Sequence, residues 1–478
     1  MSDILARLRE LQSADVPVTG GRTLAYVYDS GLADADDVGR AAVAAYAGSN
    51  GLDPTAFPSL LTMENELVGF AARLLDGPGS CVGTVTSGGT ESVLLAVQGA
   101  RDSRPDIEHP RMVLPMTAHA AFHKAAHYFG VEVVAVDVGD DFRASPAAMA
   151  AAIDEATVLV VASAPSYAHG VVDPVTEIAA AAAERGVRCH VDACIGGWVL
   201  PFAARLGRDV PPWTFAVDGV TSISVDLHKY GYAPKGTSVL LHRTAALRRP
   251  QYFASAAWPG YTMLNSTMQS TKSGGPLAGA WAVVSTIGEE GYLALTEKVL
   301  DGVARIVSGV GSIPALRVVV PPDSTLIALA ADETCDVFTV TDQMTLAGWY
   351  VQPQLSFGGS PHSWPPTIHL SLSAATADHV EEFIDALGNA VEVAVAAGPV
   401  VVDPGVADFV RALDASALSD DDFDGLLAAA GMAGGEGAGV GVGLPESMAE
   451  INALLDLATP DLREAMLVAF LDRLQRPT

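Results

Sequence analysis

Hydrophobic and polar positions divide the chain, from about residue 60 to residue 243, into two alternating kinds of segment. One kind is a short continuous apolar run rich in β-branched residues, and the other has the apolar spacing of a helix. The predicted strands are Arg111–Pro115, Val131–Val136, Thr157–Ala162, Val187–Val191, Thr221–Val225 and Thr237–Leu241. The predicted helices are Glu91–Arg101, Ala120–Phe129, Pro146–Ile153 and Pro174–Arg185. Apolar strands separated by helices indicate an α/β fold around a parallel sheet, whose ligands bind at the carboxyl ends of the strands.

Beyond this region the pattern predicts a second, smaller α/β unit. A long helix at Ala278–Val310 leads into it. Its predicted elements are strands at Leu326–Leu329 and Thr367–Leu372 and helices at Cys335–Ala347 and Ala377–Ala396. The Gly/Ala-rich segment Ala428–Gly443 is predicted to be a flexible loop, followed by an amphipathic helix pair up to Leu474. We expect an N-terminal segment at 1–60, a large domain at 61–300 and a small C-terminal domain at 301–478.

Composition narrows the range of functions. The 478 residues carry a formal charge of −29, half are hydrophobic and 17% are charged. A chain this acidic is not expected to bind nucleic acid, and its apolar content excludes general disorder. No apolar run approaches the roughly 18–20 residues that span a bilayer, so we expect no membrane anchor. The charged N-terminus is unlike a signal peptide. The four cysteines form neither a disulfide framework nor a zinc pattern. We therefore expect a cytoplasmic protein without a metal site.

A lysine that follows a buried strand is the first candidate for chemistry. Lys229 lies in the glycine-bounded segment Ser222–Gly236, directly after a predicted strand. Desolvation in a dry pocket would lower its pKa, as a Schiff-base lysine requires. The alternative is a solvated surface lysine, because lysine is rarely buried.

Three further features favour the first reading. Thr86–Ser92 opens a helix with two glycines and several hydroxyls, which suits a phosphate group, although an ordinary helix cap would look similar. Asp192 ends a predicted strand and could pair with a buried cation, and His119 could stack on a planar ring; capping roles are the alternatives for both. A phosphate cradle, a buried acid and a Schiff-base lysine in this order fit pyridoxal phosphate.

With these residues the chain resembles the group II pyridoxal-phosphate decarboxylases, most closely their sphingosine-1-phosphate lyase branch. The matching stretches are Thr86–Ser92, Thr117–Phe122, Pro165–Pro174, His190–Pro201, Thr221–Gly236 and, more weakly, Gly288–Tyr292. The resemblance implies the aspartate aminotransferase-like fold-type I, with a mainly parallel seven-stranded sheet in the large domain and a smaller C-terminal α/β domain. It also implies a homodimer with shared active sites.

The resemblance assigns roles to individual residues. Lys229 would form the Schiff base, Asp192 would pair with the pyridine nitrogen, and His119 would stack on the ring. The residues implied to bind the cofactor phosphate are Ser87, Gly88, Gly89 and Thr90, flanked by His228. Those implied to face the substrate are Tyr28, Asn50, Tyr167 and Lys235, and Tyr167, His119 and water are the candidate proton carriers.

Three departures from the lyases fall in the substrate half of the site. Asp53 replaces a histidine that helps to hold the substrate phosphate, and an acid facing a phosphate would cost affinity. Met263, Ser270 and Lys272 replace Tyr, Gly and Arg in a segment expected to reach the neighbouring subunit. The loop 358–364 looks inserted, and it either reshapes the substrate entrance or is a neutral surface insertion.

Two lyase reactions remain open. One cleaves Cα–Cβ of a β-hydroxy amine, possibly phosphorylated, to an aldehyde after the substrate amine displaces Lys229. The other is decarboxylation of an L-amino acid. Lys235 favours the first, because most decarboxylases of the group lack a lysine there, whereas the altered Asp53, Met263 and Ser270 favour the second. Transamination is disfavoured because no Arg or Lys lies between Val318 and Val410 to bind a substrate carboxylate. An inactive scaffold is disfavoured because both Lys229 and Asp192 are present.

Overall fold

A seven-stranded sheet forms the centre of the larger part of the molecule. The computed structural model describes residues 2–359, 362–429 and 447–475. The sheet order is β1-β7-β6-β5-β4-β2-β3, and only β7 runs antiparallel to its neighbours. The strands are β1 (Val82–Thr86), β2 (Arg111–Pro115), β3 (Glu132–Val136), β4 (Thr157–Ser163), β5 (Arg188–Asp192), β6 (Val220–Val225) and β7 (Ser238–His242). The predicted mainly parallel seven-stranded sheet is confirmed.

The six predicted strands are all present, and β1 is the seventh. β1 was not identified from the sequence, because Gly83 and Thr84 interrupt its apolar pattern. Gly83 has a packing reason: a Cβ atom there would lie 2.7 Å from Leu241 Cδ2 and 2.9 Å from the Leu240 carbonyl oxygen on β7. The absent side chain therefore allows β1 to pair closely with β7.

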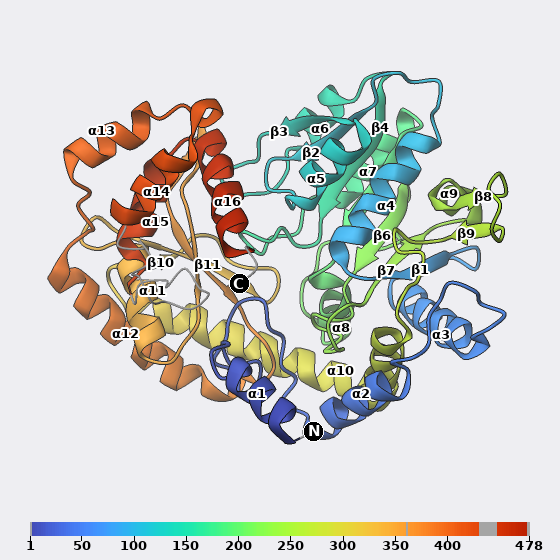
Figure 1. Cartoon of the computed structure of the whole chain (residues 1–478), viewed down its shortest axis with the longest axis horizontal. Coiled ribbons are helices and arrows are strands. Elements are labelled where there is room, and N and C mark those ends of the chain that lie inside the picture. The colour runs from blue at the N-terminus through green and yellow to red at the C-terminus, as the bar shows by residue number, and fades with distance from the viewer. Residues whose placement is uncertain (1, 360–361, 430–446, 476–478) are drawn as a thin grey trace.

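Helices cover both faces of this sheet (Figure 1). They are α3 (Pro58–Leu74), α4 (Gly89–Asp102), α5 (Ala121–Phe129), α6 (Pro146–Ala152), α7 (Val175–Glu184) and α8 (Leu200–Arg205). Four of them, α4 to α7, match predicted helices within two residues at each end. The helix α4 begins directly after β1, so its N-terminus lies where other strands deliver their carboxyl ends.

A smaller antiparallel sheet forms the centre of the C-terminal domain. Its order is β10-β11-β15-β12, with β10 (Leu316–Val318), β11 (Leu326–Ala331), β15 (Thr367–Ser371) and β12 (Gln352–Gln354). The helices α11 (Val337–Leu346) and α12 (Val380–Ala397) accompany it, and the long helix α10 (Gly274–Val310) runs beneath both sheets, with non-helical backbone angles at Gly288 (Figure 1). The predicted smaller α/β unit is confirmed.

The segment 358–364, predicted as an inserted loop, contains regular structure. β13 (Phe357–Gly359) and β14 (His362–Trp364) pair as a two-stranded antiparallel ribbon, which we call the aromatic hairpin. Another such ribbon, β8 (Phe253–Ser255) and β9 (Met263–Asn265), follows the short helix α9 (Ala245–Arg248) on the large domain.

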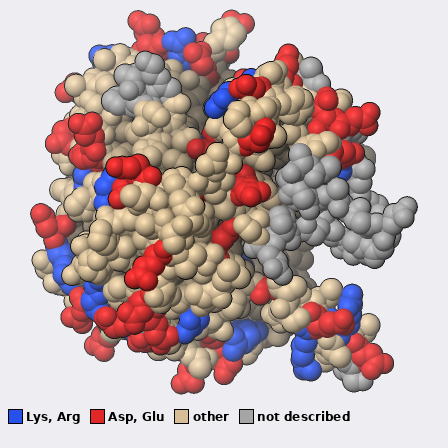
Figure 2. All heavy atoms as spheres, turned by 90° about the vertical axis from the view of Figure 1, so that its left-hand side faces the viewer, with Lys and Arg blue, Asp and Glu red and all other residues tan. Residues whose placement is uncertain are grey.

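Helices occupy both ends of the chain. The N-terminal ones are α1 (Ser2–Gln12) and α2 (Ala33–Ala45), and the C-terminal ones are α13 (Pro404–Ala412), α14 (Asp420–Ala429), α15 (Ala449–Leu457) and α16 (Pro460–Leu474). The last two confirm the predicted helix pair. Of the predicted loop Ala428–Gly443, all but the first two residues lie outside the described residues. No helix in the described part of the chain is long and apolar enough to cross a membrane. On the side shown in Figure 2, acidic side chains outnumber basic ones, as the net charge requires.

Candidate active site

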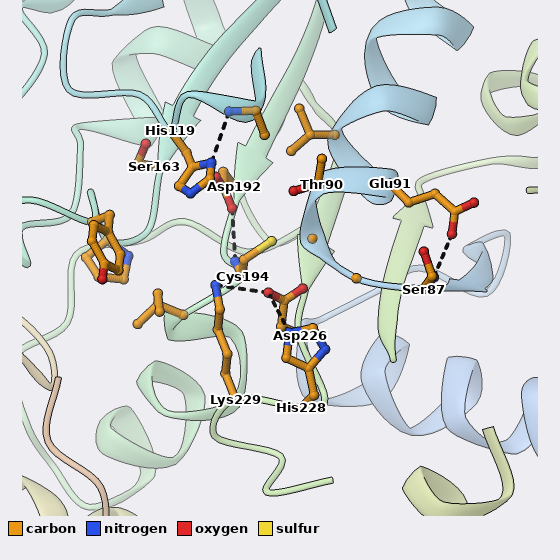
Figure 3. A pocket seen from close by; sticks show the side chains of 17 residues that line it. Ser87, Thr90, Glu91, His119, Ser163, Asp192, Cys194, Asp226, His228 and Lys229 are labelled. Carbon is orange, nitrogen blue, oxygen red and sulfur yellow. Dashed lines mark hydrogen bonds and ion pairs between the residues drawn. The ribbon is translucent and has the colours of Figure 1, made fainter. Parts of the chain in front are cut away.

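A pocket of about 330 Å³ opens where α4 begins and where β4, β5 and β6 end. Figure 3 shows side chains from these elements converging on it. Its volume is at the lower end of the roughly 300–1,000 Å³ of small-molecule sites. All eight predicted cofactor residues line it, together with Tyr167: Ser87, Gly88, Gly89, Thr90, His119, Asp192, His228 and Lys229.

Lys229 lies in this pocket and is paired with an acid that the sequence analysis did not single out. Its Nζ lies 3.0 Å from Asp226 Oδ2, and the carboxylate is almost fully buried. Burial is the largest single influence and would lower the pKa of Lys229, but the neighbouring groups together outweigh it and raise that pKa above its ordinary value. Asp226 contributes most among them, followed by Tyr28, Cys194 and Asp192. The expectation of a lowered lysine pKa is therefore wrong for the protein without a ligand. The reason is the combined effect of these neighbouring groups, of which the short-range charge pair with Asp226 is the strongest.

Asp226 is held in its ionised form by the same neighbours. Burial would raise the pKa of its carboxyl, but Lys229 and then His228 lower it, and the net shift is downward. Burial is the main reason that the pKa of His228 falls below its ordinary value, and its Nδ1–H donates to the Thr237 carbonyl at 2.7 Å. The remaining oxygen, Asp226 Oδ1, is buried and has no hydrogen-bond partner among the described residues.

The start of α4 forms a compact anion site. The first N–H groups of a helix have no intrahelical partner and carry the positive end of its dipole. At Gly89, a Cβ atom would lie 2.8 Å from both Asp226 Oδ2 and Cys194 Sγ, so only glycine leaves this space open. The geometry supports the predicted phosphate cradle.

Glu91 stabilises the turn that precedes α4, a role that was not predicted from the sequence. Its Oε2 accepts a hydrogen bond from Ser87 N–H at 2.6 Å, and its Oε1 accepts one from Met268 N–H at 2.8 Å. The carboxylate is buried and links the turn before α4 to the segment after β9.

Asp192, the last residue of β5, and His119, in the loop between β2 and α5, both face the pocket (Figure 3). Asp192 ends β5 with 9% exposure, and its Oδ1 accepts a hydrogen bond from Cys194 N–H at 3.1 Å. His119 Nδ1 accepts one from Ala121 N–H at 3.1 Å, so a neutral His119 ring carries its proton on Nε2. The hydrogen bond fixes the ring orientation, which suits the predicted role on a cofactor face.

Tyr167 is positioned by residues of the C-terminal domain. Its ring stacks on His369 with a centroid distance of 4.2 Å, and its hydroxyl donates to Gln352 Oε1 at 2.9 Å. Burial raises the pKa of Tyr167 above its ordinary value, so the side chain is a phenol at neutral pH. Nothing in the sequence pattern links Gln352 and His369 to Tyr167, because each lies about 200 residues after it in the chain.

Lys235 and Tyr28 lie beside the pocket, though not among its lining residues. The Lys235 ammonium is 5.0 Å from the centre of the Tyr28 ring and donates to the Tyr26 carbonyl at 2.7 Å. Desolvation, and next the charge of Lys229, lower the pKa of Lys235 to about 8. The pKa of Tyr28 is raised, chiefly by burial and against the opposing charge of Lys229. The two predicted substrate residues are therefore brought together near Lys229.

Asn50 and Asp53 do not line the pocket of their own chain. Asn50 Oδ1 accepts a hydrogen bond from Leu52 N–H at 3.1 Å. Asp53 is exposed, and its Oδ1 accepts hydrogen bonds from the N–H and hydroxyl of Thr55 at 2.8 and 2.6 Å, which lower the pKa of its carboxyl. Lys272 is also engaged elsewhere, with Glu64 Oε2 at 2.9 Å.

The residues present fit pyridoxal phosphate. The helix start and the Gly88–Gly89 turn suit its phosphate, the buried Asp192 suits its ring nitrogen, and Lys229 suits its aldehyde carbon. The unpartnered oxygen of Asp226 and the space kept open by Gly89 indicate a polar ligand in this pocket. Fold and site together define a fold-type I pyridoxal-phosphate protein.

Comparison with known families agrees with this class. The pyridoxal-dependent decarboxylase conserved domain matches residues 40–301, and the chain belongs to this family. A second family, described as pyridoxal-dependent enzyme, C-terminal putative HTH domain, matches residues 404–473.

Individual relatives carry two kinds of name. The chain is 39% identical over 370 residues to a sphingosine-1-phosphate lyase of Arabidopsis thaliana, covering 76% of this chain and 66% of that protein. It is 30% identical over 325 residues to a probable L-tyrosine/L-aspartate decarboxylase of Methanothermobacter thermautotrophicus, covering 68% of this chain and 85% of that protein. The structure of a sphingosine-1-phosphate lyase of Burkholderia pseudomallei superposes with a TM-score of 0.76 at 34% identity, covering 83% of this chain and 91% of that chain. For three curated lyases the matched part is only 57% to 66% of their own length.

Proposed function

We propose that the protein is a pyridoxal-phosphate-dependent carbon–carbon lyase that cleaves Cα–Cβ of a β-hydroxy amine and releases an aldehyde. The observation that carries this choice of bond is Lys235, which is next to Tyr28 and close enough to Lys229 for the two charges to interact. A cation at the side of the pocket suits an anionic group, such as a phosphate monoester, at the end of the substrate.

The cofactor, when bound, acts as an electron sink for the bond that breaks at Cα. The protein selects that bond by orienting the substrate. Asp192 would keep the ring nitrogen protonated through its carboxylate, and His119 would hold the ring from one face. Gly88 and Gly89 would leave room for the phosphate at the start of α4, where backbone N–H groups are available.

Proton transfer can be assigned to atoms of this chain. Lys229 Nζ, as a free amine, would accept the proton of the substrate's β-hydroxyl, whose oxygen becomes the aldehyde oxygen. Asp226, 3.0 Å away, stabilises the resulting ammonium. The balance is completed when the Lys229 ammonium returns this proton to Cα of the amine product. Tyr167 is a phenol whose hydroxyl is directed by Gln352, and it would orient the substrate rather than act as the base.

Decarboxylation of an L-amino acid is the second candidate, supported by the match to a probable decarboxylase. Asp53, which favoured decarboxylation in the sequence, does not line the pocket of its own chain, so its effect on a phosphate depends on the neighbouring subunit of the dimer proposed below. The Asp53 carboxylate is exposed and occupied by Thr55 in its own turn, so it does not repel a phosphate in the pocket of its own chain.

A homodimer with shared active sites and a cytoplasmic location also belong to this proposal. Support for the dimer comes from the β8–β9 ribbon and its connecting loop, where large apolar side chains are exposed: Phe253, Trp258, Tyr261 and Leu264. Asn50 and Asp53, which the resemblance places at the substrate, are then available to a neighbouring subunit. Sedimentation of the purified protein tests the dimer, and a monomer would contradict it.

Aldehyde release tests the proposed reaction. Purified holoenzyme would be incubated with β-hydroxy amines in matched pairs, with and without a phosphate monoester. We expect aldehyde from the phosphorylated member and none from Lys229→Ala, whose folding is verified by circular dichroism. Absence of aldehyde from every pair would refute the lyase proposal.

A further inference from the structure

The helices at the end of the chain hold a backbone segment that leads to the candidate active site. Asp456 Oδ1, at the end of α15, accepts a hydrogen bond from Ser356 N–H at 2.6 Å. Arg463, on α16, donates to the Ser356 carbonyl at 3.0 Å and also to the carbonyls of Leu455 and Asp456 at 2.8 and 2.7 Å. Both polar groups of the Ser356 backbone are thus bound by the terminal helices. We call Arg463, Asp456 and Ser356 the clasp.

The clasp lies at the end of a strand that holds Tyr167. β12 ends at Gln354, two residues before Ser356, and it carries the Gln352 side chain that accepts the Tyr167 hydroxyl. A shift of Ser356 would therefore be passed through this short strand to Gln352, the hydrogen-bond acceptor of Tyr167.

The aromatic hairpin also connects Ser356 to the turn that carries Tyr167. It starts directly after Ser356, and Trp364 on β14 contacts His169 edge-to-face at 5.3 Å and Phe142 at 5.3 Å. His169 itself stacks on Phe142 at 3.9 Å. Since His169 is two residues from Tyr167, the hairpin packs against the turn that carries Tyr167.

The terminal helices are also hydrogen-bonded to the C-terminal domain. Asp342 on α11 accepts hydrogen bonds from the N–H groups of Met448 and Ala449 at the start of α15, at 2.9 Å each. An acid at a helix start stabilises it. The helix pair is therefore attached to the C-terminal domain at one end and to Ser356 at the other.

Residues 404–473, which match the putative HTH family, carry a charge that does not suit binding to nucleic acid. Residues 404–473 contain three arginines and no lysine against thirteen aspartates and glutamates. Binding to phosphate backbones requires basic clusters, and Arg463 is already engaged within the chain. The helical segment thus needs another role.

We propose that this role is to position Tyr167, with Arg463 and Asp456 as positioning residues that act through Ser356. The clasp fixes β12 and the aromatic hairpin, and these two hold the Tyr167 turn from two sides. The inference does not depend on which carbon–carbon bond is cleaved.

Hydrogen–deuterium exchange on the holoenzyme tests the inference without a substrate. In Arg463→Met and Asp456→Ala we expect amide exchange in residues 352–359 and 165–171 to become roughly tenfold faster or more, because charged hydrogen bonds that hold this backbone are lost. Asp456→Asn keeps an acceptor oxygen for Ser356 N–H and should stay close to wild type. The matched control Arg411→Met removes an exposed arginine of α13 and should change neither segment.

Kinetics give the second readout once an active substrate is known. The clasp variants should lower kcat more than they raise KM, because Tyr167 is displaced while Lys235 is not. If faster exchange is confined to residues 447–475 and kcat is unchanged, the inference is wrong. If Arg463→Met unfolds, the pair Asp456→Ala and Asp456→Asn decides, and identical exchange at 165–171 in both would also overturn it. Failure of every substrate contradicts the proposed function and leaves the exchange result standing.

Discussion

The ion pair between Asp226 and Lys229 makes a prediction about how the lysine reaches its reactive form. Lys229 Nζ and Asp226 Oδ2 are 3.0 Å apart, with 19% and 2% of their side chains exposed. At an effective dielectric constant of about 20, two unit charges at this distance attract by about 5.5 kcal/mol, or roughly 4 pKa units. Asp226→Asn removes the strongest of the groups that raise the pKa of Lys229, so burial, which lowers it, is opposed only by the weaker effects of Tyr28, Cys194 and Asp192.

Capture of the cofactor reports on this pKa, because only the neutral amine reacts with an aldehyde. Apoenzyme would be mixed with pyridoxal phosphate over a range of pH, and the appearance of visible absorbance would be followed. Partial access of water to the pocket weakens the pair, so we expect the midpoint for Asp226→Asn to fall by at least about 2 pH units. Borohydride trapping and mass spectrometry would verify that Lys229 is the residue modified.

Asp226→Glu is the matched control, since it keeps the charge and should keep the midpoint within about one unit of wild type. The pH dependence of pyridoxal phosphate itself is common to all variants and cancels in the comparison. Identical midpoints for wild type and Asp226→Asn would refute the reasoning that Asp226 governs the charge of Lys229.

Three other predictions concern the substrate, the cofactor and the core. In Lys235→Met, kcat/KM for a phosphorylated substrate should fall by roughly 10–100-fold, as expected for a lost charged hydrogen bond, with little change for the unphosphorylated analogue. Because the pKa of Lys235 is lowered to about 8, its ammonium deprotonates above that pH, and the wild-type KM for the phosphorylated substrate should then rise. An equal rise of KM in Lys235→Met would contradict this. Gly89→Ala places a Cβ atom 2.8 Å from Asp226 Oδ2 and should weaken cofactor binding, measured by absorbance titration, at least roughly tenfold; unaltered affinity would show that the phosphate lies elsewhere. Trp198→Ala removes a fully buried ring that stacks on Phe70 and should lower the free energy of unfolding by about 3–5 kcal/mol in denaturant titrations, and a loss below about 1 kcal/mol would contradict tight packing there.

Much of the large domain follows from local pattern. Five of the six predicted strands are almost fully buried, which is why their positions could be assigned from the sequence. The sixth, β3, lies at the edge of the sheet and is only partly buried. β1 was missed because a glycine and two threonines reduce its apolar character, and the reason for Gly83 is the distant Leu241. The hairpin β13–β14 was missed because each strand has only three residues.

The cofactor half of the site could be predicted for a topological reason. Asp192 and Lys229 follow neighbouring parallel strands, and such strands deliver their carboxyl ends to one edge of the sheet. The sequence does not give distances. The 3.0 Å contact that makes Asp226 the strongest of the groups raising the pKa of Lys229 is set by the path of the loop after β6. The same applies to Tyr167, whose stacking and hydrogen-bond partners come from the other domain.

The substrate half was predicted less completely. Lys235 and Tyr28 meet near Lys229, and their contact with a substrate stays a prediction. Asn50 and Asp53 form turn contacts within their own segment, and a single chain does not bring them to the pocket. Whether they contact a substrate depends on a neighbouring subunit, which no local pattern describes.

The most direct test of the proposed reaction is to measure aldehyde and carbon dioxide in parallel. The same purified holoenzyme would be given a panel of phosphorylated and unphosphorylated β-hydroxy amines and of carboxyl-labelled L-amino acids. A carbon–carbon lyase that uses Lys235 for an anionic group should release aldehyde from a phosphorylated β-hydroxy amine and no carbon dioxide from the amino acids. Release of carbon dioxide without aldehyde would contradict the account and identify an amino-acid decarboxylase.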